Sequence, residues 1–136
     1  MQDVEGVLSK ISILVVDDME SIRALVKSCL LELGAQKVTV DNDGEGAWKT
    51  LNSHRIDLII SDMDMPKIDG LTLLQRVRFS EKLQHIPFIM LTAETERDKV
   101  MESIKRGASD YVTKPFKPQD LAYRVIKQLR KIKIPA

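Results

Sequence analysis

The sequence predicts an α/β fold, a doubly wound five-stranded parallel sheet with helices on both faces. Short apolar runs at residues 13–16, 58–60 and 88–91 are bounded by polar residues, which is typical of strands buried on both faces. Between these runs, apolar residues recur at three- and four-residue steps, the spacing of amphipathic helices. Strands that alternate with helices favour a parallel sheet with right-handed crossovers.

Two weaker runs complete the predicted sheet. Residues 37–40 alternate polar and apolar side chains, and residues 111–112 form a short run among polar neighbours, so both suit edge strands. The strand order 2-1-3-4-5 places these two runs at the edges and the three apolar runs inside. Ligands of such sheets bind beyond the carboxyl ends of the strands, at the switch point between strands one and three.

Five helices are expected to cover this sheet. The clearest has an apolar stripe from Ile22 to Leu33 and ends at Gly34, a residue suited to the left-handed conformation of a helix terminus. The remaining helices are expected to begin near these residues: Asp43, Gly70, Thr95 and Pro118.

Composition indicates one globular domain. The 136 residues are 43% hydrophobic and 30% charged, which is typical of a single folded domain. We assign residues 1–10 to an N-terminal tail, 11–132 to the domain and 133–136 to a C-terminal tail. The 21 basic and 20 acidic residues nearly cancel, so we expect neither nucleic acid nor a membrane as partner.

The sequence also predicts a cytoplasmic protein. No stretch has the length and apolar character of a signal peptide or a membrane span. The only cysteine, Cys29, cannot form an internal disulfide, which fits a reducing compartment. We expect the protein to act as a monomer.

Three carboxylates are expected to meet at the switch point. Asp17 and Asp18 end the first predicted strand, and Asp62 ends the third. At ~4 Å and an effective dielectric constant near ~20, two like charges repel by roughly 4 kcal/mol, which a bound cation or a proton would relieve. An oxygen-only, partly open site favours Mg2+. One strand-end aspartate more often caps a helix, but three together favour a metal site.

Two other strand ends supply complementary groups. Thr92 closes the fourth strand with a hydroxyl, and Lys114 closes the fifth with an ammonium. Taken singly, Lys114 is more often a surface charge and Thr92 a satisfied strand terminus. Combined with a cation, both could offset charge on a phosphoryl group that is transferred to Asp62 as nucleophile. The set predicts phosphoryl transfer.

The ordered motifs resemble those of bacterial response-regulator receiver domains of two-component phosphorelay signalling. The resemblance spans about residues 11–132, and the complete set is specific although each pair alone is weak. It implies a flavodoxin-like (βα)5 fold, Mg2+ as cofactor and a sensor histidine kinase as phosphoryl donor. The motifs are Asp17-Asp18, Ser61-Asp62-Met63-Asp64-Met65-Pro66, Asp69-Gly70, Thr92-Ala93, Gly107-Ala108 and Lys114-Pro115-Phe116.

The resemblance implies that Asp62 is the phosphoacceptor. The ligands of Mg2+ would be Asp17, Asp18, Asp62 and the backbone carbonyl of Asp64. At the position of Asp64, chemotaxis regulators typically carry asparagine. We hypothesise that the Asp64 carboxylate adds negative charge beside the metal and alters the lifetime of the phosphoryl group. A carboxylate that points outward into solvent is the equally weighted alternative.

The resemblance also implies how a signal leaves the site. Thr92 and Lys114 would contact the phosphoryl group, and the Lys114–Pro115 peptide bond is expected to be cis. Thr92 would move toward the phosphoryl group and Tyr111 would turn inward behind it. The face made by the fourth helix, the fifth strand and the fifth helix would then change its preference for an unidentified output protein.

Within this family, the neighbourhoods of Ile22-Arg23 and Ala108-Ser109 are most similar to stand-alone receivers of the chemotaxis type. No output domain is expected after Ile132. A receiver excised from a larger regulator is the alternative that stays open.

Three other functions share part of this pattern. Asp62-Met63-Asp64 also resembles the nucleophile and general acid of haloacid-dehalogenase-type phosphatases, but there the pair ends the first strand, and Pro66 stands where Thr or Val is usual. A flavodoxin would need a hydroxyl- and glycine-rich loop where Asp17-Asp18 stands. A degenerate receiver, which binds partners without phosphorylation, is disfavoured because all the site residues are present. We therefore predict no enzyme but a signalling domain that catalyses only its own phosphorylation and dephosphorylation.

Overall fold

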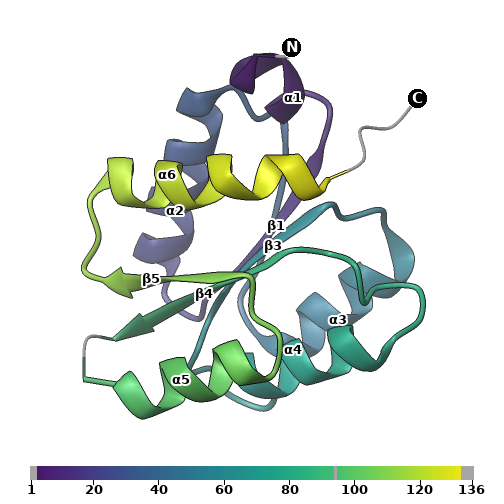
Figure 1. The fold of residues 1–136 in the computed structure, drawn as a ribbon, viewed down its shortest axis with the longest axis vertical. Coiled ribbons are helices and arrows are strands. Elements are labelled where there is room, and N and C mark those ends of the chain that lie inside the picture. Colours follow the sequence, from purple (N-terminus) through teal and green to yellow (C-terminus); the bar gives the residue numbers. More distant parts are fainter. Residues whose placement is uncertain (1–2, 94, 133–136) are drawn as a thin grey trace.

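A parallel sheet lies at the centre of the fold (Figure 1). The computed structural model describes residues 3–93 and 95–132, and within these residues five strands pair in the order β2-β1-β3-β4-β5. The predicted fold class and strand order are confirmed. The strands are β1 (Ser12–Val16), β2 (Lys37–Asp41), β3 (Leu58–Asp62), β4 (Phe88–Ala93) and β5 (Asp110–Lys114).

Burial of the strands follows their place in the sheet. Every residue of β3 is buried, and β1 and β4 are buried except at one end, whereas β2 and β5 are partly exposed. The register pairs Val16 with Ser61 and Asp62 with Leu91. The carboxyl ends of the three central strands therefore meet at one edge of the sheet, where polar side chains can gather.

Helices cover both faces of the sheet. In Figure 1, α1, α2 and α6 lie on one face, and α3, α4 and α5 lie on the other. No helix of the described part of the chain has the length and apolar character needed to cross a membrane. The helices are α1 (Val4–Leu8), α2 (Glu20–Leu33), α3 (Gly44–Ser53), α4 (Gly70–Phe79), α5 (Arg97–Lys105) and α6 (Pro118–Gln128), which continues into a 3-10 turn, Leu129–Lys131.

The core has two halves because neighbouring strand residues point to opposite faces. Ile13 and Ile60 pack with α1, α2 and α6, whereas Leu14 and Ile59 pack with α3 and α4. Cys29 lies buried in the first half. Each half seals one face of the sheet and leaves the carboxyl edge of the strands open to ligands.

Local sequence explains where the helices next to this edge begin and end. The side chains of Asp43 and Asp69 accept hydrogen bonds from the backbone N–H of Gly46 and Thr72, so both residues act as N-caps. Helix α2 ends at Gly34, whose φ of 117° lies in the left-handed region that glycine tolerates.

One helix boundary and one domain boundary differ from the prediction. Helix α5 begins at Arg97, after an N-cap at Glu96, so the predicted start at Thr95 was two residues early. The segment assigned to an N-terminal tail contains α1, and its Leu8 is fully buried against α2 and α6. Only five residues long, α1 is too short to show a helical period clearly. Residues 133–136, assigned to a C-terminal tail, lie outside the described residues.

Candidate functional site

Three carboxylates lie together at the carboxyl edge of the sheet. Asp17 and Asp18 follow β1, and Asp62 ends β3; one oxygen of each lies within 4.8 Å of the others. Asp17 and Asp62 are buried, and Asp18 is exposed. The structure thus brings the three predicted residues together in an acidic cluster (the acidic pocket) that could hold a metal ion, and oxygen ligands of this kind fit Mg2+.

Lys114 bridges two of these carboxylates. Its Nζ lies 2.7 Å from Oδ2 of Asp17 and 3.0 Å from Oδ1 of Asp62. The Lys114 side chain is only 19% exposed, so water screens these ion pairs weakly. The peptide bond from Lys114 to Pro115 is cis, as the resemblance implied. The lysine of the edge strand β5 therefore reaches the pocket between β1 and β3, as predicted.

The charges in the pocket shift each other's protonation. Burial raises the pKa of Asp62 above its ordinary value, and the hydrogen bond from Lys114 offsets only part of that rise. Burial alone would lower the pKa of Lys114, but its hydrogen bonds to Asp17 and Asp62 hold the pKa above its ordinary value. Lys114 is therefore a stable cation beside a carboxylate that is costly to ionise.

Glycine lets α4 begin directly against the pocket. A Cβ on Gly70 would overlap the backbone carbonyl oxygen of Asp62 and lie 2.9 Å from the Cα of Met63. The Gly70 N–H donates to the carbonyl oxygen of Met63 at 2.8 Å. The Asp69-Gly70 motif thus combines an N-cap with a residue small enough to pack on the strand that carries Asp62.

A second polar cluster adjoins the pocket. Thr92 is 1% exposed, and its hydroxyl donates to Oε2 of Glu96 at 3.3 Å. Lys99 Nζ lies 2.9 Å from Oδ1 of Asp64 and 3.9 Å from Oε1 of Glu96. A hydrogen bond between the Asp64 and Glu96 carboxyls lowers the pKa of Asp64 and raises that of Glu96. Two acidic groups and one lysine are therefore coupled next to Thr92.

Asp64 lies at the rim of the pocket. Its side chain is 56% exposed, and its charge is paired with Lys99. This environment agrees with the outward-pointing alternative for the Asp64 carboxylate. The sequence does not indicate Glu96 or Lys99 as site residues, because their contacts depend on where α5 begins.

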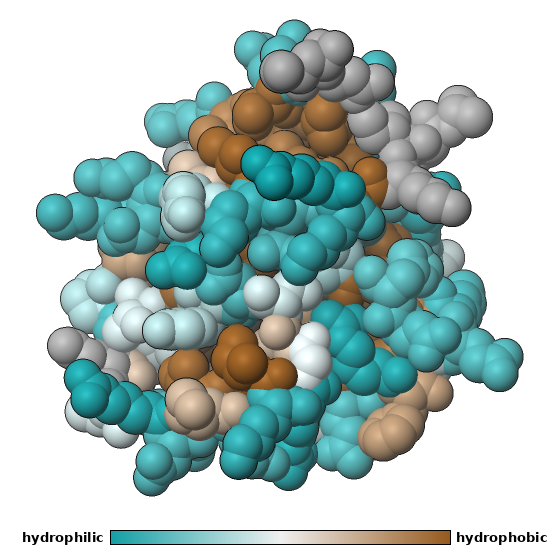
Figure 2. All heavy atoms as spheres, in the orientation of Figure 1, coloured by the Kyte–Doolittle hydropathy of each residue, from teal (hydrophilic) through white to brown (hydrophobic). Residues whose placement is uncertain are grey.

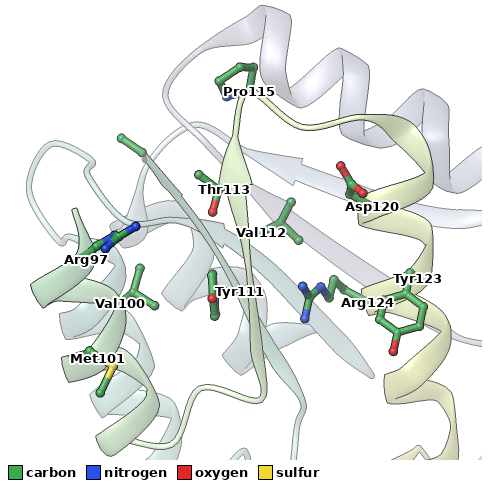
Figure 3. Close-up of a pocket in the computed structure, with 11 residues that line it drawn as sticks. Arg97, Val100, Met101, Tyr111, Val112, Thr113, Pro115, Asp120, Tyr123 and Arg124 are labelled. Carbon is green, nitrogen blue, oxygen red and sulfur yellow. The ribbon is translucent and has the colours of Figure 1, made fainter. Parts of the chain in front are cut away.

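A groove lies between α5 and α6 across β5 (Figure 3). It encloses ≈ 800 Å³, and Figure 3 shows the side chains of the two helices facing each other across it. Figure 2 shows an apolar area over α5, whose Met101 and Ile104 are exposed. The groove is lined chiefly by Arg97, Val100, Met101, Tyr111, Thr113, Tyr123 and Arg124.

Tyr111 links this groove to the sheet. The guanidinium carbon of Arg124 lies 5.8 Å from the centroid of the Tyr111 ring, within the range of a cation–π contact. Arg124 also donates to Oδ1 of the buried Asp110 at 2.9 Å. The predicted switch residue thus lies on the face expected to meet an output protein, while Thr92 lies beside the acidic pocket.

An acidic pocket at the switch point of a 2-1-3-4-5 sheet, bridged by a lysine, is the arrangement that the resemblance to receiver domains implied. Comparison with known proteins gives the same class. Residues 13–126 match the family described as "Response regulator receiver domain". The chain belongs to this family and is a receiver domain of two-component signalling.

Individual relatives and structures agree with this assignment. Chemotaxis protein CheY of Pseudomonas aeruginosa is 37% identical over 120 residues, which cover 88% of this chain and 97% of that protein. The probable transcriptional regulator ycf27 of Cyanidium caldarium is 46% identical over 121 residues, which cover 88% of this chain and 47% of that protein. A putative response regulator from Chloroflexus aurantiacus has a TM-score of 0.84 and 34% identity, with 88% of this chain and 98% of that chain covered. The phosphatase and flavodoxin alternatives are not favoured.

Proposed function

We propose that this receiver accepts a phosphoryl group from a sensor histidine kinase on Asp62. The observation that carries the proposal is the ion pair between Lys114 and Asp62, 3.0 Å apart in the pocket that Asp17 and Asp18 complete. In the proposed step, an oxygen of Asp62 forms a bond to phosphorus while the bond between phosphorus and the donor's histidine nitrogen breaks. The products are an acyl phosphate and a free histidine.

Mg2+ is the proposed cofactor. The carboxylates of Asp17, Asp18 and Asp62 would hold it together with the backbone carbonyl of Asp64. When bound, the ion would offset negative charge on the carboxylates and on the phosphoryl oxygens. The mutual approach of the three carboxylate oxygens supports this site, because like charges so close need a counter-charge.

Lys114 and Thr92 are proposed to contact the phosphoryl group. Phosphoryl transfer needs positive charge and hydrogen-bond donors at the equatorial oxygens of phosphorus. The ammonium of Lys114 is already beside Asp62, and Thr92 brings a hydroxyl to the end of the neighbouring strand β4. Their role is to stabilise negative charge on the phosphoryl oxygens, which Asp62 alone cannot stabilise.

The signal is proposed to leave through the groove between α5 and α6, which are the fourth and fifth of the predicted helices. Tyr111 lines that groove, and with Thr92 it would form the switch. A change in the position of Tyr111 would alter the surface that an output protein meets.

Full-length similarity to chemotaxis proteins supports a chemotaxis-type output. The match to about half of a transcriptional regulator supports, as second candidate, a receiver within a larger protein. The monomeric state and the cytoplasmic location stay predictions.

The proposal is tested by incubating the protein with a small-molecule acyl phosphate and Mg2+ and measuring its intact mass. We expect the wild type to gain one phosphate and Asp62→Asn to gain none. Omission of Mg2+ should slow the gain strongly. An equal gain in both proteins would overturn the assignment of Asp62. Steady turnover of an external phosphate ester would instead indicate an enzyme.

A further inference from the structure

Glu96 occupies an unusual place for its residue type. It is the N-cap of α5, a position where Ser, Thr, Asp and Asn are preferred, and its side chain makes no capping hydrogen bond within the described residues. The carboxylate turns instead toward β4 and accepts the hydrogen bond of Thr92. Helix capping therefore does not explain this glutamate.

The surroundings of Glu96 hold its carboxylate in place. The Glu96 side chain is only 17% exposed, and Lys99, one turn further along α5, lies 3.9 Å from its Oε1. Lys99 in turn pairs with Asp64. These contacts join the end of β4, the first turn of α5 and the loop after β3. Thr92 is therefore held by residues other than the three carboxylates of the acidic pocket.

The hydroxyl of Thr92 has a single proton to donate, which it shares between Oε2 of Glu96 at 3.3 Å and the carbonyl oxygen of Ala93 at 3.4 Å. While that proton is directed at Glu96, it cannot be donated to a phosphoryl oxygen on Asp62. Thr92 is 1% exposed, so water is a poor alternative partner for its hydroxyl. The hydrogen bond with Glu96 and a hydrogen bond with the phosphoryl group are therefore mutually exclusive states of the same side chain.

We propose that Glu96 is a positioning residue that holds Thr92 in the unphosphorylated state, as a latch which phosphorylation must open. The inference rests on the proposed roles of Asp62 and Thr92. Opening the latch removes the contact that Glu96, at the N-cap of α5, makes with the end of β4. The event at Asp62 is thereby transmitted to the helix that lines the output groove.

Beryllofluoride with Mg2+ is the probe for this latch, because it binds a carboxylate as a stable mimic of a phosphoryl group. The dissociation constant is measured by isothermal titration calorimetry. Removing the carboxylate in Glu96→Ala should tighten binding by about five- to tenfold, the net effect of one ordinary hydrogen bond. Glu96→Gln keeps an acceptor oxygen without the charge and should show an intermediate gain.

A matched control separates the latch from a general loss of charge on α5. Glu102 lies on the same helix and pairs with Arg106 on its exposed side. Glu102→Ala should leave the dissociation constant within about twofold of the wild type, because exposed helix pairs contribute little. A gain in Glu102→Ala equal to that of Glu96→Ala would overturn the latch.

A double-mutant cycle tests whether Glu96 acts through the Thr92 hydroxyl. Thr92→Val removes the proton that Glu96 accepts while keeping the shape of the side chain. In that background, Glu96→Ala should no longer change the dissociation constant. A gain that persists without the hydroxyl would show that Glu96 acts by charge alone, and the latch would be wrong.

The outcomes keep the two proposals apart. If the wild type does not bind beryllofluoride, the proposed function of the pocket fails, and the latch fails with it. If the wild type binds but Glu96→Ala binds no more tightly, the latch alone fails. Thermal unfolding of each variant shows whether it is folded, and Glu96→Gln replaces Glu96→Ala in the cycle if the alanine variant unfolds.

Discussion

The ammonium of Lys114 lies 2.7 Å from a carboxylate oxygen of Asp17, although 97 residues separate them in the sequence. Asp17 is fully buried, so an unpaired charge there would be costly. In the metal-free protein, Lys114 is the positive group that balances the pocket. A bound divalent cation would also balance this negative charge. The stability of the fold should therefore depend on both Lys114 and the cation.

Lys114→Met should therefore destabilise the metal-free protein by about 2–3 kcal/mol, because it leaves buried carboxylates without their partner. With saturating Mg2+ the loss should be smaller, since the ion supplies positive charge to the folded state only. Urea unfolding with chelator and with Mg2+ measures both values. Lys82→Met, in the loop before β4, is the control and should show no dependence on Mg2+. Equal losses for Lys114→Met in the two buffers would contradict the shared role.

Asp62→Asn should raise the free energy of unfolding at neutral pH in the presence of chelator. Burial raises the folded-state pKa of Asp62 above its unfolded value, so the protonated form favours the fold. That stability is present below the unfolded pKa and is lost as pH rises through the folded pKa. Asparagine resembles the protonated form at every pH.

The gain from Asp62→Asn should accordingly shrink as pH falls below the raised pKa. Urea unfolding of the two proteins over a series of pH values from neutral to acidic measures it. A gain that grows on acidification would show that the pKa is lowered and not raised.

Gly70→Ala should destabilise the protein by about 2 kcal/mol or more and weaken Mg2+ binding, because the new methyl group would overlap the backbone of β3 at Asp62. Gly46→Ala is the matched control, since its Cβ would meet only side-chain atoms, of Asp41 and Asp43. It should change stability by about 1 kcal/mol or less. Thermal unfolding and Mg2+ titration measure both variants. Equal effects would contradict the special fit of Gly70.

Leu8→Ala should destabilise the protein by about 3 kcal/mol, the usual effect of truncating a fully buried leucine. The apolar residues of α1 would then be part of the domain, which was predicted to start at residue 11. Val4→Ala, at a partly buried position of the same helix, is expected to have a smaller effect. Equilibrium unfolding of both variants is the measurement. A negligible effect of Leu8→Ala would mean that the segment contributes nothing to the fold.

Much of the fold could be predicted because the apolar runs differ in how continuous they are. A strand with a continuous apolar run, such as residues 58–60, must be covered on both faces. Such strands therefore lie inside the sheet, and the more polar strands lie at its edges. The positions of Asp17, Asp62 and Lys114 follow, because the carboxyl ends of parallel strands meet at one edge. A strand's last residue is then enough to place its side chain near the pocket.

The parts that escaped prediction depend on short or irregular segments. Helix α1 is too short for a period to appear, and its packing depends on contact with distant α2 and α6. The contacts of Glu96 and Lys99 depend on where α5 begins. Spacing in the sequence carries no signal for such contacts.

The most direct test of the central claim is to locate the phosphorylated residue itself. The protein is treated with an acyl phosphate and Mg2+, the acyl phosphate is reduced with borohydride, and peptides are sequenced by mass spectrometry. Reduction converts a phosphorylated aspartate into homoserine. We predict homoserine at position 62 and its loss when Mg2+ is chelated. Homoserine at Asp17 or Asp18, with Asp62 unmodified, would contradict the claim.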